Sequence, residues 1–537
     1  MKIKCVFTIT LLFFFYLSSS QTFVKDFNSI NEFISNGEQS FFVADDGIHG
    51  VELWKTEGAN NNTVLIKDIN TLSSSSPNQL FIYNNEVYFT AHDGVFGREL
   101  WKTDGTEQGT IMVKNIHTVF GASSNPNDFT IYNNELYFTA TDNYAGAGFQ
   151  IWKTNGTEEG TVKVYDGNGI SISQLVTANN KLYFKLSYGP NGLIEYNGNN
   201  TFNQLSIDDY YTINRLNSFN DELYLTTNTS NNQSIRIYKL GASGNPILLQ
   251  EYTRPQYGDI EIYNLTQVGS EVYFSITTDF NSDDDIDQLW KTDGTYAGTT
   301  VVKSFDWTTY LYQSNISNFI AYQNELYFNS GSQNNYTLWK SDGTASGTVQ
   351  VSNVSVNNST GFIVLNDLLF FTSSQKLWST DGSETNTQKI SDLSIENPTY
   401  DNLFSFKADS NKVYFKSQYQ NSKALFTTDS NPIIEVKMGY SVIEPNSNTS
   451  FESKIDSVVK QTIRIKNIGN KDLVFSNIKV IGEDFYIDGQ ILSNVSGENP
   501  DGNFSQVIEP GNESNFDISF YPSTEGLKKR DLKYVKQ

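Results

Sequence analysis

Short apolar segments, separated by turns rich in Asn, Asp and Gly, recur along most of the chain. One recurring piece is IYNNEVYF at residues 82–89, which returns with few changes at residues 131–138 and 321–328. Two apolar stretches around an Asn-Asn pair predict two antiparallel strands joined by a tight turn. Weaker copies of this hairpin occur at residues 179–184, 221–225, 269–274, 366–371 and 411–415.

A second recurring piece follows these hairpins and contains six of the seven tryptophans. Its clearest copy is ELWKTDGTEQGT at residues 99–110, and residues 150–161, 288–299 and 337–348 match it closely. Residues 52–58 and 376–382 are looser copies. Asp bonds its own backbone downstream and Gly accepts a positive φ, so the piece predicts a strand, a tight turn and the beginning of another strand.

We assign a structural role to the residues of this motif because the turn acid varies among the copies. Asn155 and Glu57 occupy the position that Asp104 has in the clearest copy. A turn tolerates this variation, whereas a catalytic acid or a metal ligand would not. The motif residues covered by this interpretation are Trp54, Trp101, Asp104, Gly105, Trp152, Trp290, Asp293, Gly294, Trp339, Asp342, Gly343, Trp378 and Asp381.

Each repeated unit contains four short strands, and nine copies follow one another at a period of about 46 residues from Trp54 to Phe426. Four strands at this period predict an all-β fold, a β-propeller of eight or nine blades. An open β-solenoid is the alternative. Residues 22–27 resemble the fourth strand of a unit but precede the first unit. We therefore expect them to complete the last blade and close the ring.

The pattern changes at both ends of the repeats. From residue 431 onward, short alternating strands predict a small immunoglobulin-like β-sandwich, so the predicted domains are a propeller at residues 21–430 and a sandwich at residues 431–537. Lys2 and Lys4, an apolar run and a Ser-rich stretch before Gln21 predict a signal peptide at residues 1–20. The run is short for a membrane-spanning helix, which makes an uncleaved anchor the weaker alternative.

The amino-acid composition limits the cellular locations and the binding partners that we expect for this protein. The formal net charge of -23 argues against binding to nucleic acid or to anionic lipid. After cleavage of the signal peptide we expect no membrane span, and we expect a secreted or cell-surface protein. The single cysteine, Cys5, lies in the signal peptide, so a mature chain would have neither disulfides nor thiolate metal sites.

The repeats resemble the ELWxxDGT-repeat family of exported bacterial proteins over roughly residues 38–430. The C-terminal part is similar to the choice-of-anchor D domain, a Hydin-like immunoglobulin-like sandwich. Residues 465–473, 482–485 and 508–522 carry that likeness. The resemblance implies export and often retention at the cell surface, but it implies no known reaction.

One acidic segment is a candidate calcium loop. Asp279, Asn281, Asp283 and Asp285 place oxygen-bearing side chains at alternate positions, as at the beginning of such a loop. Asp284 stands where an EF-hand needs Gly, and Trp290 stands where it needs Glu, so an exposed acidic turn is the alternative. We expect no other cofactor. His49 and His92 lie in Gly-rich loops, but equivalent copies lack them.

These observations favour an exported, non-enzymatic binding or adhesion protein. Its ligand would be a carbohydrate or another surface protein, bound at a propeller rim, because exposed aromatic and amide groups suit sugars. The alternatives are a propeller-fold glycan hydrolase or lyase, which would need paired carboxylates, and a structural scaffold of a surface complex.

Overall fold

The structure is a computed structural model of the whole chain, which divides into two compact units. One unit is Thr22–Thr427, and the other combines Met1–Gln21 with Thr428–Gln537. The described residues are 3–7, 11–12, 21–37, 39–142, 148–187, 192–207, 211–229, 234–241, 244–253, 259–279, 287–305, 314–332, 335–357, 361–365, 367–391, 393–395, 406–410, 412–419, 422–429, 434–438, 441–442, 449–453, 459–467, 473–475, 485–488, 506–508, 513–520 and 534–535.

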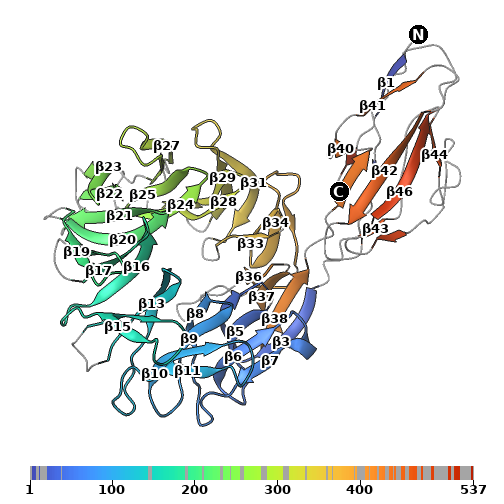
Figure 1. Ribbon diagram of the computed structural model, residues 1–537. Coiled ribbons are helices and arrows are strands. Elements are labelled where there is room, and N and C mark those ends of the chain that lie inside the picture. Colours follow the sequence, from blue (N-terminus) through green and yellow to red (C-terminus); the bar gives the residue numbers. More distant parts are fainter. Residues whose placement is uncertain are drawn as a thin grey trace. The chain divides into compact units, whose positions relative to one another are not determined.

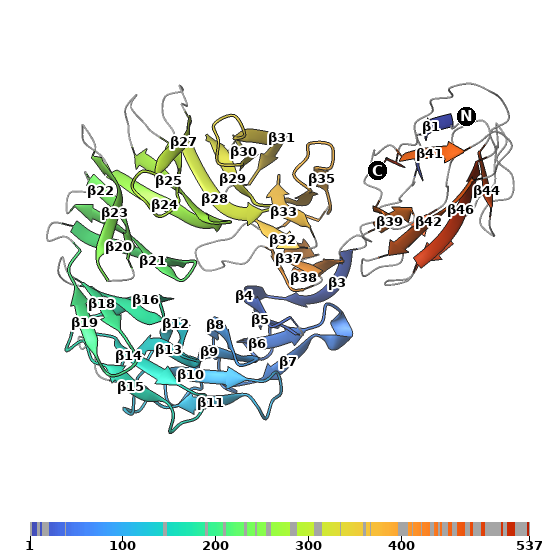
Figure 2. The same ribbon diagram turned by 45° about the horizontal axis from the view of Figure 1, so that its top comes forward.

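The larger unit is a ring of nine four-stranded antiparallel sheets, which are the blades of a propeller (Figure 1; Figure 2). Blades 1 to 3 comprise β4 (Ser29–Ser35), β5 (Ser40–Asp45), β6 (Val51–Thr56), β7 (Val64–Lys67); β8 (Asn78–Tyr83), β9 (Glu86–His92), β10 (Arg98–Thr103), β11 (Ile111–Lys114); and β12 (Asn127–Tyr132), β13 (Glu135–Ala140), β14 (Gln150–Thr154), β15 (Val162–Tyr165). A short 3-10 helix, η1 (Asn60–Asn62), lies between β6 and β7.

The next five blades repeat the same order of strands. Blades 4 to 6 comprise β16 (Ile172–Ala178), β17 (Lys181–Leu186), β18 (Leu193–Tyr196), β19 (Phe202–Leu205); β20 (Tyr211–Phe219), β21 (Glu222–Thr229), β22 (Ser234–Leu240), β23 (Pro246–Thr253); and β24 (Asp259–Val268), β25 (Glu271–Asp279), β26 (Asp287–Thr292), β27 (Thr300–Phe305). Blades 7 and 8 comprise β28 (Ser314–Tyr322), β29 (Glu325–Ser332), β30 (Asn335–Ser341), β31 (Val349–Val356); and β32 (Ile363–Leu365), β33 (Leu368–Ser373), β34 (Lys376–Thr380), β35 (Gln388–Lys389).

The ninth blade closes the ring with a strand from the other end of the propeller. It contains β36 (Phe406–Ala408), β37 (Lys412–Tyr419) and β38 (Ser422–Asp429), and its outer strand is β3 (Gln21–Phe27). In Figure 1 the blue β3 lies beside the orange β38. The predicted closing strand and the propeller are confirmed with nine blades, and the open solenoid was wrong.

The first two strands of a blade are joined by the predicted Asn turn. Asn84 and Asn85 both have positive φ, at 51° and 64°, and Asn133 and Asn134 repeat this at 50° and 59°. Two successive left-handed residues define a type I′ turn, which matches the twist of the flanking strands and favours Asn. The Asn pair therefore sets the register of the hairpin.

The hydrophobic core is divided into nine clusters among the described residues, one between each pair of neighbouring blades. Trp101, for example, packs with Phe41 and Leu53 of blade 1 and with Phe89 of its own blade. Both faces of a blade are thus covered, which explains the nearly continuous apolar character of its two central strands.

The inner strands, which face the centre of the ring, contain β-bulges that link the blades. Glu32 lies in the bulge of β4, and its two carboxylate oxygens accept hydrogen bonds from the backbone of Gln79 and Leu80, both at 3.1 Å. Asp128 in blade 3 accepts one from Gln174 of blade 4 at 3.1 Å. Gln174 in turn accepts one from Leu216 of blade 5 at 2.9 Å. No pattern in the sequence indicated these bulges.

The second unit contains antiparallel sheets. A five-stranded sheet has the order β40-β39-β42-β46-β44, and β43 pairs with β45. Their bounds are β39 (Ile434–Met438), β40 (Ser441–Val442), β42 (Val459–Asn467), β43 (Leu473–Phe475), β44 (Phe485–Asp488), β45 (Gln506–Ile508) and β46 (Glu513–Phe520). These pairings do not confirm the immunoglobulin-like sandwich, which stays a prediction.

Two short strands lie inside the predicted signal peptide. β1 (Ile3–Phe7) pairs with β41 (Thr449–Ser453), and β2 (Leu11–Leu12) pairs with β47 (Tyr534–Val535). Cleavage before Gln21 stays a prediction.

Candidate functional site

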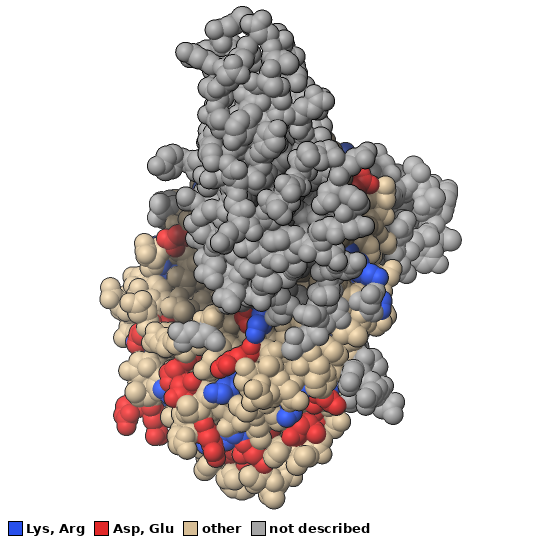
Figure 3. Space-filling model, turned by 90° about the vertical axis from the view of Figure 1, so that its right-hand side faces the viewer, with Lys and Arg blue, Asp and Glu red and all other residues tan. Residues whose placement is uncertain are grey.

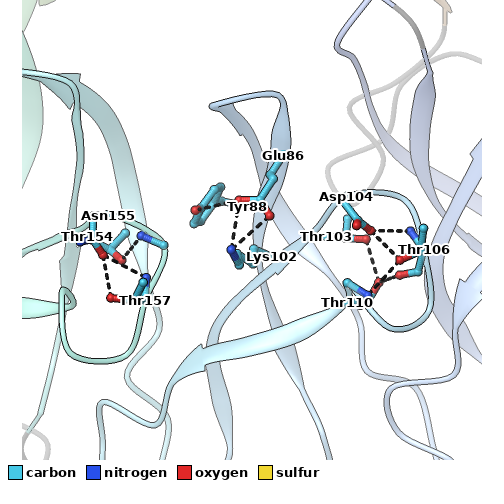
Figure 4. Close-up of polar contacts among 12 residues, drawn as sticks. Glu86, Tyr88, Lys102, Thr103, Asp104, Thr106, Thr110, Thr154, Asn155 and Thr157 are labelled. Carbon is cyan, nitrogen blue, oxygen red and sulfur yellow. Dashed lines mark hydrogen bonds and ion pairs between the residues drawn. The ribbon is translucent and has the colours of Figure 1, made fainter.

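The repeated motif folds into a hydrogen-bonded turn between the third and fourth strands of a blade, here called the signature turn (residues 103–110 in blade 2). Asp104 Oδ1 accepts hydrogen bonds from the backbone N–H and the hydroxyl of Thr106, at 2.8 and 2.7 Å (Figure 4). The hydroxyls of Thr103 and Thr110 lie 2.7 Å apart and are buried. The Thr106 hydroxyl is the main cause of the lowered pKa of Asp104. This carboxylate is therefore ionised and engaged by its own turn.

The other copies of the motif lie in equivalent turns. Asp293 and Asp342 accept the same pair of bonds, and Asn155 and Asp381 do so in blades 3 and 8. Gly105, Gly294 and Gly343 all have φ near 88°. Trp54, Trp101, Trp152 and Trp290 are buried, while Trp339 and Trp378 are partly buried against their clusters.

The second glycine of the motif has a role that the sequence alone did not suggest. A Cβ at Gly109 would collide with the carboxylate of Asp104, and a Cβ at Gly347 would collide with that of Asp342. In blade 8 the equivalent residue is Asn386, whose side chain instead donates to Asp381 at 2.6 Å. The recurring spacing of the two glycines was the pattern from which this constraint could have been inferred.

Each signature turn also rests on the preceding blade. Gly156, in the turn of blade 3, lies against Tyr88 of blade 2, so that an added Cβ would be 2.5 Å from the Tyr88 hydroxyl. The Lys102 ammonium lies 3.4 Å from the same Cβ position and pairs with Glu86 at 3.1 Å (Figure 4). A tyrosine of the preceding blade meets the turn glycine in the same way at Gly58, Gly294, Gly343 and Gly382, whereas Gly105 of blade 2 meets Gln39 and Phe41 of blade 1. The motif therefore joins neighbouring blades as well as reversing the chain.

The Lys–Glu ion pair beneath these turns is reversed in one blade. Blades 2, 3, 5, 6 and 7 have Glu on the second strand and Lys on the third, as in Glu135–Lys153 at 2.8 Å. In blade 4, Lys181 occupies the Glu position and pairs with Glu195 at 2.9 Å. Because both partners are exchanged together, we infer that the pair itself stabilises a blade.

This inference predicts the effect of reversing Glu135 and Lys153. Each single reversal, Glu135→Lys or Lys153→Glu, should lower the free energy of unfolding by about 0.5–1 kcal/mol, because like charges then face each other. The double reversal should return it to within about 0.3 kcal/mol of the wild type. Urea unfolding followed by tryptophan fluorescence measures this, since the six described tryptophans all lie in the propeller. Purely additive single effects would contradict the inference.

The opposite rim of the propeller, here called the loop rim, contains the loops between second and third strands and the connections between blades. Blades 1 and 2 contribute four such segments, residues 45–50, 68–77, 92–97 and 115–126, and these segments expose large apolar side chains. These side chains, here called the apolar band, are Ile48 (82% exposed), Leu72 (95%), Val95 (44%), Phe96 (41%), Val119 (39%) and Phe120 (82%). Among the described residues, the loop rim exposes no large hydrophobic side chain outside this band. Large apolar side chains that are exposed on neighbouring segments make this part of the rim a candidate interaction site.

Two buried glutamates hold the connections that present Leu72 and Phe120. Glu52 accepts hydrogen bonds from the backbone of Ile69 and Ser75 and from the Ser75 hydroxyl. Glu99 accepts them from the backbone of Ile116 and Ser124, at 2.9 and 3.1 Å, and from the Ser124 hydroxyl at 2.6 Å. Both glutamates are fully buried.

The only indication in the sequence that these glutamates have a structural role was their position in the repeat. Glu52 and Glu99 both stand two residues before the motif tryptophan, and Ser75 and Ser124 both lie shortly before a Pro-containing segment. Burial raises the pKa of Glu52, and it raises the pKa of Glu99 to about 7.

The predicted calcium loop falls largely outside the described residues. Asn281, Asp283 and Asp285 are not described, and of Asp279 only the backbone, at the end of β25, is described. His49 Nδ1 lies 2.8 Å from Asp46, and His92 Nδ1 accepts a bond from the backbone of Gly94. Within the described parts of the chain, no group of three or more His, Cys, Asp or Glu side chains is placed to hold a metal ion.

The described residues contain no helix that is both long and apolar enough to span a membrane.

Comparison with family models and with curated proteins gave no match. The resemblance to ELWxxDGT repeats and to the choice-of-anchor D domain therefore stays a prediction.

Solved structures gave distant matches. Among them are prolyl endopeptidases (TM-score 0.39, 14% identity, 64% of this chain and 54% of that chain) and dipeptidyl peptidase 4 from Porphyromonas gingivalis (TM-score 0.39, 12% identity, 76% and 64%). Another is oligogalacturonate lyase from Vibrio parahaemolyticus (TM-score 0.36, 11% identity, 65% and 98%). These neighbours are enzymes, but such TM-scores transfer no activity to this chain, and the propeller assignment rests on its own sheets.

Proposed function

We propose that this protein is an exported, non-enzymatic binding protein that contacts its ligand through the apolar band of the loop rim. The observation that supports this most is the near-complete exposure of Leu72, Ile48 and Phe120 on neighbouring loops of that rim. Burying one such side chain on binding would contribute about 2 kcal/mol, so three of them form a substantial anchor.

A protein ligand fits the apolar band better than a carbohydrate does. Sugar sites combine aromatic faces with convergent hydrogen-bonding groups. The most exposed members of the band include the aliphatic Ile48 and Leu72, which offer a sugar neither stacking nor hydrogen bonds. Aliphatic and Phe side chains of this kind are typical of the apolar centre of a protein–protein interface.

A retention experiment tests this function. The purified protein and its Leu72→Ser/Phe120→Ser variant would be incubated with intact bacterial cells and with insoluble polysaccharides, and the supernatant would be assayed for released sugar. Tyr296→Ser is the matched control, because Tyr296 is 66% exposed on a signature turn at the other rim. We expect saturable retention on cells that falls at least fivefold in the double variant and is unchanged in the control.

Other results would overturn the proposal. Released sugar would favour the glycan hydrolase or lyase. Equal retention of the wild type and the double variant would place the binding surface elsewhere on the protein.

A further inference from the structure

The four segments that contain the apolar band are tied to one another. The backbone N–H of Val51 donates to the Ser74 hydroxyl at 2.9 Å, and that of His92 donates to the Ser75 carbonyl at 3.0 Å. The backbone N–H of Arg98 donates to the Ser123 hydroxyl at 2.9 Å. These bonds link each strand loop to the neighbouring connection, so the segments that carry the exposed side chains of blades 1 and 2 are joined into one pre-ordered array.

The strand loops also lie very close to the neighbouring connections at two glycines, Gly50 and Gly97. A Cβ at Gly50 would be 2.7 Å from the Ser74 hydroxyl, and a Cβ at Gly97 would collide with the carbonyl of Ala122. Both glycines have positive φ, at 77° and 83°. With the glutamate contacts of Glu52 and Glu99, they hold Leu72 and Phe120 in place. A ligand would therefore lose little free energy to ordering of these loops.

Apart from the histidines His49, His92 and His117, the ionisable side chains on these segments are all acidic. Residues 45–50, 68–77, 92–97 and 115–126 contain Asp45, Asp46, Asp68 and Asp93, and no Lys or Arg. Arg98 follows directly, but its guanidinium donates to the carbonyl oxygens of Ser76 and Thr90. On the face drawn in Figure 3, Asp and Glu atoms likewise outnumber Lys and Arg atoms over the described residues.

The turn geometry places the carboxylates of Asp46 and Asp93 at the beginning of the loops that carry the apolar side chains. Asp46 Oδ1 accepts hydrogen bonds from the backbone of Ile48 and His49, both at 2.9 Å. Asp93 Oδ1 accepts them from Val95 and Phe96, both at 2.8 Å. Burial opposes ionisation of Asp46, but these bonds outweigh it and lower its pKa. Each apolar loop tip thus begins with a carboxylate.

We infer that the apolar band binds a cationic polypeptide segment in which Leu- or Phe-like side chains stand beside Lys or Arg. This inference rests on the proposed function and deepens it by naming the class of partner. The apolar side chains of the partner would cover Leu72, Ile48 and Phe120, and its cations would meet Asp46 and Asp93. Opposite charge at the rim of an apolar contact speeds association and excludes partners of the wrong charge.

The same charges disfavour two other occupants. A second copy of this chain would bring acidic loops against acidic loops in a symmetric contact. An anionic lipid surface would be repelled by the four carboxylates and by the net charge of -23.

A model peptide tests the inference directly. The probe is a fluorescein-labelled amphipathic peptide of Leu and Lys, and its two controls replace every Lys by Glu or every Leu by Ser. Binding is measured by fluorescence anisotropy at 0.05 and at 0.3 M NaCl, where the Debye length is about 14 and about 6 Å respectively. The variants are Leu72→Ser/Phe120→Ser and Asp46→Asn/Asp93→Asn, and the latter keeps the oxygen acceptor of each turn. Matched controls are Tyr296→Ser and Glu107→Gln/Glu158→Gln, which lie on signature turns at the other rim.

We expect saturable binding of the Leu/Lys peptide only. The apolar double variant should weaken it at least tenfold. The Asn double variant should weaken it about fivefold and reduce its salt dependence, while the control variants bind as the wild type does. Equal weakening by the control variants would show unspecific attraction to an acidic protein and would overturn the inference.

The remaining outcomes also overturn the inference. They are binding of the Leu/Glu peptide, retention of the protein on phosphatidylcholine–phosphatidylglycerol vesicles through Leu72 and Phe120, and self-association that the apolar double variant abolishes. Failure here is distinguishable from failure of the proposed function. If the apolar double variant loses retention on cells while the Leu/Lys peptide does not bind, the loop rim still binds but the partner is of another class.

Discussion

Replacing Gly156 with alanine is expected to lower the free energy of unfolding of the propeller by about 3 kcal/mol. About 1 kcal/mol of this arises because Gly156 has a φ of 90°, which alanine adopts only with strain. The remaining 2 kcal/mol or so arises because the new Cβ would lie 2.5 Å from the hydroxyl of Tyr88 in the preceding blade. Urea unfolding followed by tryptophan fluorescence measures the total.

Two further variants separate the two causes. Gly37 also has a φ of 90° but has no atom within 4 Å of an added Cβ, so Gly37→Ala should show the backbone strain alone. Tyr88→Phe removes the oxygen that obstructs the new methyl group. In the Gly156→Ala/Tyr88→Phe double variant we therefore expect a favourable coupling of about 1–2 kcal/mol. If Gly37→Ala and Gly156→Ala lowered the free energy of unfolding equally and the double variant showed no coupling, the turn would not pack against the neighbouring blade as described.

Replacing Glu99 with alanine is expected to destabilise the propeller by about 3 kcal/mol. The substitution would leave the backbone N–H groups of Ile116 and Ser124 without the acceptor that they have in the folded protein. Buried donors without acceptors cost about 1–3 kcal/mol each. Glu99→Gln should cost less, because Gln can still accept one of these bonds, and Gln150 occupies the same repeat position in blade 3. Glu107→Ala is the control, because Glu107 is exposed on the signature turn.

The pH dependence of stability provides a separate test of Glu99. Burial raises its pKa to about 7 in the folded protein, above the ordinary value of 4.5. The folded state therefore binds the proton more tightly than the unfolded state does. This contribution is fully present below pH 4.5 and is lost as the pH rises through about 7. The free energy of unfolding of the wild type should fall by about 3 kcal/mol relative to Glu99→Gln over this interval.

A result of the opposite sign would be equally informative. If the wild type gained stability relative to Glu99→Gln as the pH rises, the hydrogen bonds to the carboxylate would outweigh its burial. The glutamate would then hold the connection as an anion at every pH above its ordinary pKa.

Prediction from the sequence succeeded where neighbouring residues alone decide the geometry. The Asn84–Asn85 pair prescribes a type I′ turn because Asn tolerates the left-handed conformation, and Asp104–Gly105 prescribes a tight reversal for a similar reason. The period of the motif predicted the blades, and the early segment at residues 22–27 predicted how the ring closes. These are local propensities and repeats, which are visible in a single chain.

Contacts between segments distant in the sequence could not be predicted in this way. Glu99 could be recognised only as a position of the motif. Its role could not be predicted, because it depends on hydrogen bonds with Ser124 of the following connection. The collision that excludes a side chain at Gly156 depends on Tyr88 in another blade. Leu72 and Phe120 are single apolar residues in polar segments, and their common rim follows only from the antiparallel order of the strands.

The sequence by itself therefore determined the all-β repeat, its turns, its closing strand and its acidic character, because each follows from the types and spacing of nearby residues. Only the tertiary structure decided that there are nine blades and which residues join them. It also brought Ile48, Leu72, Val95 and Phe120 to one rim beside four aspartates. The physical reason is that burial, exposure and opposed charges are properties of surfaces, and a surface exists only after distant segments of the chain have packed together.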